Sequence, residues 1–167
     1  MGLDMYLFLK KSEYVGTYVA DKDTDLTLDY PLGMEKIEET LKAMGDSKSV
    51  SRDSLYKVGY WRKANAIHKW FVDNCADGED DCRPVECEVE QLESLLESCK
   101  LVKRVPDMAA EVLPTQCGFF FGSTEYDEYY FSDIDDTIKI LENVIEFIKN
   151  AEAREDYSWS VVYEASW

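Results

Sequence analysis

The sequence predicts an α+β protein, a single domain in which a small, mostly antiparallel sheet packs against about four helices. Three observations predict this class. Apolar residues alternate with polar ones near both ends of the chain, they recur at helical spacing in its middle, and strands and helices do not alternate regularly as they do in a doubly wound fold. Residues 1–167 contain no repeat and no linker, so we expect one acidic domain.

Two strands are expected at the start of the chain. The extended segment 3–10 carries apolar side chains on one face, namely Leu3, Met5, Leu7 and Leu9. Residues 14–20 are rich in strand-forming residues and precede a turn-like segment at 21–23. They are therefore expected to pair with the first strand in antiparallel fashion.

Four segments have the spacing of helices: 34–44, 60–74, 89–102 and a last one that begins at Ser132. Ser132 and Asp135 match a capping box at the start of this last helix. Residues 118–122 are expected to form a buried strand or a tight turn between two glycines. The alternation of residues 157–163 predicts a final strand.

The net charge of the chain limits the kinds of molecule that it is expected to bind. The chain has 35 acidic and 18 basic residues, a net charge of −17, which repels nucleic acid and anionic lipid and attracts basic surfaces. No apolar run approaches the roughly 18 residues needed to cross a bilayer. The N-terminus lacks the features of a signal peptide, and five cysteines are an odd number, which favours reduced thiols. These observations predict a cytoplasmic protein that binds neither nucleic acid nor membrane.

The first candidate site is a basic segment, residues 57–69, which contains four basic residues and no acidic one. Arginine can bind phosphate or carboxylate in a two-point fork while an aromatic ring stacks. The candidate ligand-binding residues are Tyr60, Arg62, Lys63, Asn65 and His68. The alternative is that Arg62 and Lys63 only pair with surplus carboxylates. Asp4 would need such a partner if it were buried.

His68 is the only histidine, and it shares a helical face with Trp61 and Phe71. We expect it to be partly buried and bonded to a carbonyl or a carboxylate, rather than to act as a base. Cys75, Cys82 and Cys87 lack the close spacing of a zinc site. Residues 73–84 lack oxygen ligands that an EF-hand requires. No metal, cofactor or catalytic residue is therefore predicted.

The second candidate site is an acidic, tyrosine-rich surface within residues 123–156. Carboxylates along a helix can imitate phosphates, and tyrosines can anchor an interface, although solubility alone could explain the charge. The candidate partner-binding residues are Glu125, Tyr126, Asp127, Glu128, Tyr129, Tyr130, Asp133, Asp136, Glu142 and Glu146. A basic protein would be attracted to such a surface.

Three stretches carry a resemblance: Gly2-Leu-Asp-Met-Tyr6, the run from Gly59 to Phe71, and the run from Leu113 to Tyr130. Together they resemble a family of small, uncharacterised proteins of bacteriophages, prophages and bacteria. The resemblance implies the cytoplasm of a bacterial host as the setting and implies no catalytic residue. The first hypothesis is a phage-type accessory protein whose acidic face binds and blocks a basic, nucleic-acid-binding host or defence protein. The alternative is an enzyme or small-ligand module that recognises a phosphate or carboxylate at residues 57–69.

Overall fold

The computed structural model describes the backbone of residues 2–18 and 48–167 and the side chains of residues 2–13 and 52–167. The chain divides into two compact units, residues 1–11 with 55–167 (unit 1) and residues 12–54 (unit 2). In the described part of unit 2, Ser12 Oγ donates a hydrogen bond to Asp53 Oδ1 at 2.8 Å. The helix expected over residues 34–44 and the turn expected at 21–23 lie outside the described residues.

A four-stranded antiparallel sheet has the order β2 (Lys48–Arg62), β1 (Asp4–Tyr18), β4 (Trp159–Ser166) and β3 (Val85–Cys87). β1 and β4 pair over eight residues, from Asp4 opposite Ser166 to Lys11 opposite Trp159. The first and last strands of the chain are thus the two central strands. The alternation at residues 3–9 is confirmed, because the predicted apolar face of β1 is buried. The α+β prediction is confirmed as well.

Two predictions, one of a strand and one of a helix, need correction. Residues 14–18 do not form a second strand, because they continue β1. The helix predicted over residues 60–74 begins later, at Asn65, because residues 60–62 belong to β2. Gly59 allows this strand to pack closely: a Cβ added there would lie 2.9 Å from Ile140 Cγ2 and 3.1 Å from Leu7 Cβ. Trp61 still faces the core as its helical spacing suggested, but it does so from a strand.

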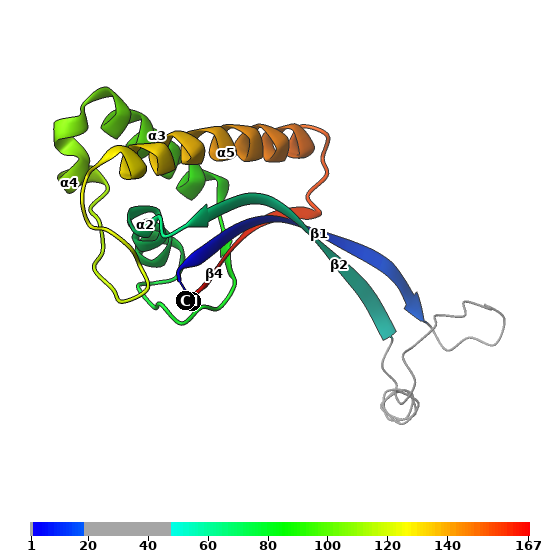
Figure 1. Cartoon of the computed structure of the whole chain (residues 1–167). Coiled ribbons are helices and arrows are strands. Elements are labelled where there is room, and N and C mark those ends of the chain that lie inside the picture. Colours follow the sequence, from blue (N-terminus) through cyan, green and yellow to red (C-terminus); the bar gives the residue numbers. More distant parts are fainter. Residues whose placement is uncertain (1, 19–47) are drawn as a thin grey trace. The chain divides into compact units, whose positions relative to one another are not determined.

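The helices of unit 1 pack against the sheet and against one another (Figure 1). They are α2 (Asn65–Cys75), α3 (Val89–Arg104), the 3-10 turn η1 (Pro106–Met108), α4 (Ala109–Val112) and α5 (Glu128–Glu152). α3 and α5 lie side by side (Figure 1). The helix predicted over residues 89–102 is confirmed, because α3 covers these residues. No helix in the described part of the chain has the length and hydrophobicity to span a bilayer.

The start of α5 also differs from the prediction. Asp127 caps the helix, since its Oδ1 accepts hydrogen bonds from the backbone N–H groups of Tyr129 and Tyr130 at 3.0 and 3.2 Å. Ser132 and Asp135 consequently lie inside the helix, and the capping box predicted there is wrong. Asp is as strong a cap as Ser, and Asp127 comes first along the chain. Tyr130, which the earlier start brings into the helix, is buried.

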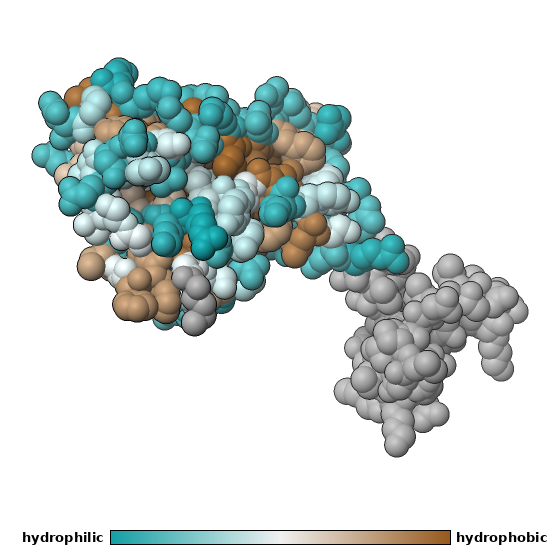
Figure 2. All heavy atoms as spheres, in the orientation of Figure 1, coloured by the Kyte–Doolittle hydropathy of each residue, from teal (hydrophilic) through white to brown (hydrophobic). Residues whose placement is uncertain are grey.

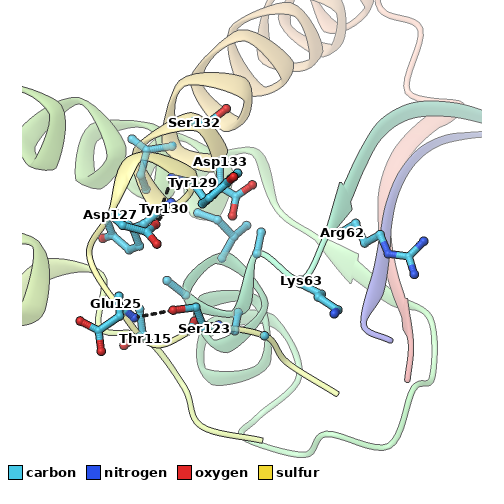
Figure 3. A pocket seen from close by; sticks show the side chains of 16 residues that line it. Arg62, Lys63, Thr115, Ser123, Glu125, Asp127, Tyr129, Tyr130, Ser132 and Asp133 are labelled. Atoms are coloured by element: carbon cyan, nitrogen blue, oxygen red, sulfur yellow. Dashed lines mark hydrogen bonds between the residues drawn. The ribbon is translucent and has the colours of Figure 1, made fainter. Parts of the chain in front are cut away.

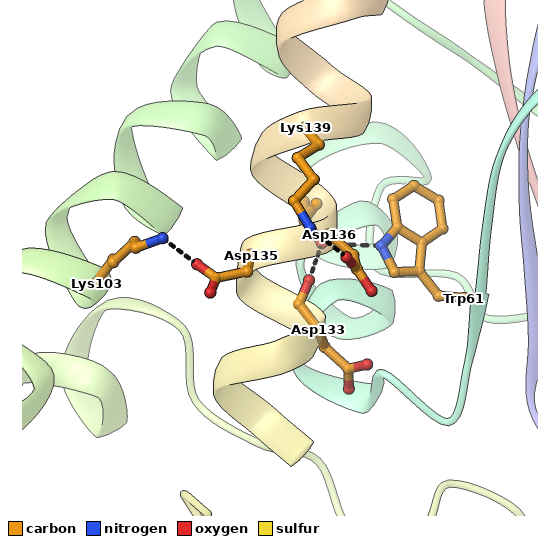
Figure 4. Close-up of polar contacts among 7 residues, drawn as sticks. Trp61, Lys103, Asp133, Asp135, Asp136 and Lys139 are labelled. Atoms are coloured by element: carbon orange, nitrogen blue, oxygen red, sulfur yellow. Dashed lines mark hydrogen bonds and ion pairs between the residues drawn. The ribbon is translucent and has the colours of Figure 1, made fainter. Parts of the chain in front are cut away.

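A buried hydrogen-bond chain joins α5 to the end of β2. Trp61 Nε1 donates to Thr137 Oγ1 at 2.9 Å, and Thr137 Oγ1 donates to the backbone oxygen of Asp133 at 2.6 Å (Figure 4). Thr137 is fully buried. Each buried polar group in this series of hydrogen bonds has a partner. The two bonds therefore fix the position of α5 relative to the end of β2.

Residues 118–121 form a tight turn, one of the two alternatives that the sequence left open. Phe121 N donates to Gly118 O at 3.1 Å, and a Cβ on Gly118 would lie 2.7 Å from the Phe121 ring. The three phenylalanines of the turn have different environments. Phe121 is buried and Phe120 is half-buried, whereas Phe119 is 96% exposed.

Candidate functional site

A pocket of about 290 Å³ lies where β2 ends and α2 begins (Figure 3). The end of β2 and the first turn of α2 form one side, and the loop around residues 115–127 and the first turns of α5 form the rest. The pocket brings together members of both candidate sites. Arg62, Lys63 and Asn65 come from the predicted ligand-binding set, and Glu125, Asp127, Tyr129, Tyr130 and Asp133 come from the predicted partner-binding set.

The chain reverses sharply at the edge of this pocket. Lys63 has φ of 62°, in the left-handed region, and its backbone N–H donates to Leu3 O at 2.8 Å. Asn65 N donates to Lys63 O at 2.8 Å across Ala64, whose φ of −74° and ψ of 68° are those of an inverse γ-turn. A left-handed lysine is strained by about 1 kcal/mol or more, and such strain is often found at functional sites.

The buried side chain of Asn65 holds the opposite loop in place. Its Nδ2 donates to the backbone oxygens of Phe121 at 2.9 Å and Ser123 at 2.7 Å, and its Oδ1 accepts from Gln116 N at 3.0 Å. Asn65 is only 4% exposed. Since both of its side-chain N–H groups are used in these bonds, Asn65 shapes the pocket rather than donating to a ligand.

Lys63 is a cationic residue that lines the pocket, and its ammonium group points away from the carboxylates of the opposite side (Figure 3). A Cβ added to Gly122 would lie 3.1 Å from Lys63 Cβ, and one added to Gly2 would lie 3.2 Å from Lys63 Cε, so the stem runs closely past both glycines. The residue is exposed. No ion pair links Lys63 or Arg62 to a carboxylate within the described residues. The guanidinium of Arg62 points away from the acidic side of the pocket, toward the sheet (Figure 3).

The expected pairing of Asp4 with Arg62 or Lys63 is wrong. Asp4 is half-buried, and its Oδ1 accepts a hydrogen bond from Tyr60 Oη at 2.6 Å. This bond raises the pKa of Tyr60, because it stabilises the protonated phenol. Tyr60 does not line the pocket. Asp4 is thus satisfied by Tyr60 in the neighbouring strand β2, rather than by a cation of the basic segment.

Carboxylates line the side of the pocket formed by the loop and α5 (Figure 3). Burial, followed by the charges of Asp136 and Asp127, raises the pKa of Asp133 to about 6. Asp135 and Asp136 pair with lysines, Lys103 at 2.5 Å and Lys139 at 3.0 Å (Figure 4). No such partner reaches the Asp133 carboxylate in the part of the chain that the structure describes.

His68 lies outside the pocket and is almost fully buried. Its Nδ1 is 2.8 Å from Tyr163 Oη and its Nε2 is 3.1 Å from Asp80 Oδ2. Asp80 Oδ1 accepts a further hydrogen bond from Trp167 Nε1 at 3.0 Å. The prediction of a buried histidine bonded to a carboxylate is confirmed. Burial, with the charge of Asp80 next, holds the pKa of Tyr163 well above its usual value, so the Tyr163 hydroxyl stays protonated at neutral pH.

The acidic surface is less uniform than its sequence suggests. Tyr130 is buried and its Oη donates to Leu113 O at 2.9 Å, so its assignment as an exposed interface anchor is wrong. Asp136 and Glu142 pair with Lys139 and Lys100, which interrupts the negative row along α5. On the face drawn in Figure 2, hydrophilic residues predominate and apolar ones gather in small, separate groups. The exposed members of the predicted set that lack an ion pair are Glu125, Tyr126, Glu128, Tyr129 and Glu146.

The sequence did not point to the glycine and hydroxyl residues that line the pocket, which are Thr115, Gly122, Ser123 and Ser132. Gly122 has φ of 87°, and the glycine pair that brackets residues 119–121 was the available signal for a constrained loop. Nothing in the linear sequence indicated that this loop faces Lys63. Comparison with family models, with curated proteins and with solved structures gave no match. The resemblance to phage proteins therefore stays a prediction.

Asn65→Asp tests whether the amide holds the loop. The substitution keeps the acceptor for Gln116 N but replaces two N–H donors with a carboxylate facing the oxygens of Phe121 and Ser123. We expect the free energy of unfolding to fall by about 3 kcal/mol at pH 7, as for a buried hydrogen-bonded group left unsatisfied. Urea denaturation measures this change. Asn143→Asp, on the exposed side of α5, is the control and should change stability by less than about 0.5 kcal/mol.

Asp133→Asn tests the raised pKa. The unfolded carboxyl ionises near its ordinary value of 3.8 and the folded one near 6, so the folded state loses stability as pH rises between these values. The variant should therefore be more stable than the parent by about 1–2 kcal/mol at pH 7, after allowance for solvent screening. This advantage should disappear below about pH 4. An advantage that does not depend on pH, measured by urea denaturation from pH 3.5 to 7.5, would contradict the assignment.

Proposed function

We propose that this protein is a small-ligand-binding module that recognises an anionic group, a carboxylate or a phosphate, at the pocket beside Lys63. The observation that carries the proposal is the pocket itself, formed where the basic segment ends. Its volume of about 290 Å³ is at the lower end of the range for small-molecule sites. We assign no reaction to it, because no nucleophile and base are placed together among the residues that line it.

The unpaired charge of Lys63 supports recognition of an anion. In a chain with a net charge of −17, most lysines have carboxylates within reach, and ion pairs of this kind join Lys100, Lys103 and Lys139 to acids of α5. Lys63 has no such partner within the described residues, although it is held in a strained conformation against Gly122. The backbone of Lys63 is therefore fixed while its charge stays unpaired, so an anion that binds there need not displace an existing partner.

Lys63→Asn removes the charge while keeping a residue that tolerates the left-handed conformation. We expect the affinity for acetate and for inorganic phosphate to fall at least tenfold, since a hydrogen bond to a charged group contributes about 1.5–3 kcal/mol. Isothermal titration calorimetry at low ionic strength measures this. Lys69→Asn is the matched control, because Lys69 pairs with Asp73 and does not line the pocket. An equal loss in both variants would show a general charge effect and refute the proposal.

A basic protein partner is the second candidate. The exposed Glu125, Glu128 and Tyr129, of which Tyr129 is 73% exposed, gather at the start of α5 and could anchor such a partner. In this proposal the chain is an accessory protein that blocks a nucleic-acid-binding protein of a bacterial host.

Charge reversal tests this second candidate. Glu125→Lys with Glu128→Lys should abolish the capture of basic, nucleic-acid-binding proteins from bacterial lysate, and capture by the parent should weaken steeply with salt. Glu152→Lys with Glu155→Lys, at the other end of α5, makes the same change in net charge and should leave capture intact. Capture that survives the first pair, or that does not depend on salt, removes this candidate.

A further inference from the structure

We propose that the ligand of this pocket is dipolar, with a protonated amine that binds at Asp133 and an anionic group that binds at Lys63. This inference rests on the proposed function and goes further by naming the second charged group of the ligand. It follows from an arrangement that the sequence did not suggest, in which a lysine of the basic segment and a carboxylate of the acidic helix line one pocket.

Two opposite charges line this pocket and neither is neutralised. Lys63 and Asp133 have no ion pair with each other or with another described residue. On the same helix, Asp135 and Asp136 have each found a lysine, so an acid of α5 without a cation is the exception among these neighbours. Charges near a surface usually pair when their side chains can reach. Figure 3 shows Lys63 and Asp133 apart from each other, with the Lys63 side chain pointing away from Asp133.

The fold explains why the two charges do not meet. The stem of Lys63 lies against Gly122 and Gly2, and its backbone is fixed by the bond from Lys63 N to Leu3 O. The backbone of Asp133 is fixed by its helix and by the hydrogen bond from Thr137 Oγ1. The backbones of both residues are therefore fixed at separate parts of the pocket, and a ligand that bridges them need not displace an existing ion pair.

The acidic wall is suited to an ammonium group. Asp133 is half-buried, and Asp127 and Glu125 add negative charge to the same pocket. A cation bound there would favour the ionised form of Asp133, whose pKa of about 6 is raised by burial and by neighbouring acids. Ala64, Ala66, Ile67 and Ile134 also line the pocket and offer an apolar surface for the carbon chain between the two charged ends.

A series of ω-amino acids from glycine to 6-aminohexanoate tests the inference, each compared with the carboxylate of equal chain length that lacks the amine. Isothermal titration calorimetry on the full chain at pH 7 should find one optimal length, at which the amino acid binds at least tenfold tighter than its amine-free analogue. Asp133→Asn should reduce this ratio to near one, and it should not weaken binding of the amine-free carboxylate, because it removes a negative charge from the pocket. Lys63→Asn should weaken both compounds.

Two controls make the outcome decisive. Glu146→Gln removes an exposed carboxylate of the same helix outside the pocket and should change no affinity. At pH 6, binding of the best amino acid should release protons, seen as a dependence of the measured heat on the ionisation enthalpy of the buffer, and Asp133→Asn should abolish this release.

The binding data distinguish failure of the dipolar ligand from failure of the anion-binding function. Equal binding of the amino acids and their amine-free analogues at every length overturns the dipolar ligand and leaves the anion-binding proposal in place. Absence of binding by both series overturns both. Tight binding of the amino acids that survives Asp133→Asn also overturns the inference, because the amine would then bind elsewhere.

Discussion

One buried amide determines the shape of the candidate site. Asn65 begins α2, and its side chain bonds to the backbone at residues 116, 121 and 123. These three bonds hold an irregular loop, whose polar groups cannot be satisfied by a regular element, against the start of a helix. The loop in turn brings Gly122 to the stem of Lys63. Without the amide, the pocket would lose one wall.

Strain and close packing concentrate at the same place. Lys63 is left-handed, Gly122 has positive φ, and the turn at residues 118–121 allows no Cβ at Gly118. A protein accepts such costs where the surrounding structure fixes the backbone strongly, as the bonds from Asn65 and to Leu3 O do here. The combination of a fixed backbone and an unpaired lysine distinguishes this site from the ion-paired surface of α3 and α5.

Electrostatics divides the acidic residues of the second half of the chain into two groups. Those that face α3 are largely neutralised by its lysines, as in the contact between Lys100 and Glu142. Those at the start of α5 either cap the helix, as Asp127 does, or line the pocket, as Asp133 does. The net charge of the chain therefore sums over acidic residues in two different environments. In one the carboxylates form ion pairs on the surface, and in the other they line the pocket.

The sequence by itself determined the class of fold, the buried face of β1, the position of α3 and the satisfied state of His68. These depend on local periodicity and on the rule that buried polar groups find partners, and both can be read from the order of residues. Only the tertiary structure decided that residues 57–62 form a strand and that Tyr130 points inward. It also decided that Lys63 and Asp133 share a pocket. These facts depend on contacts between separate segments, such as Tyr130 with Leu113 and the end of β2 with the start of α5, and no local pattern records which segment will supply the partner.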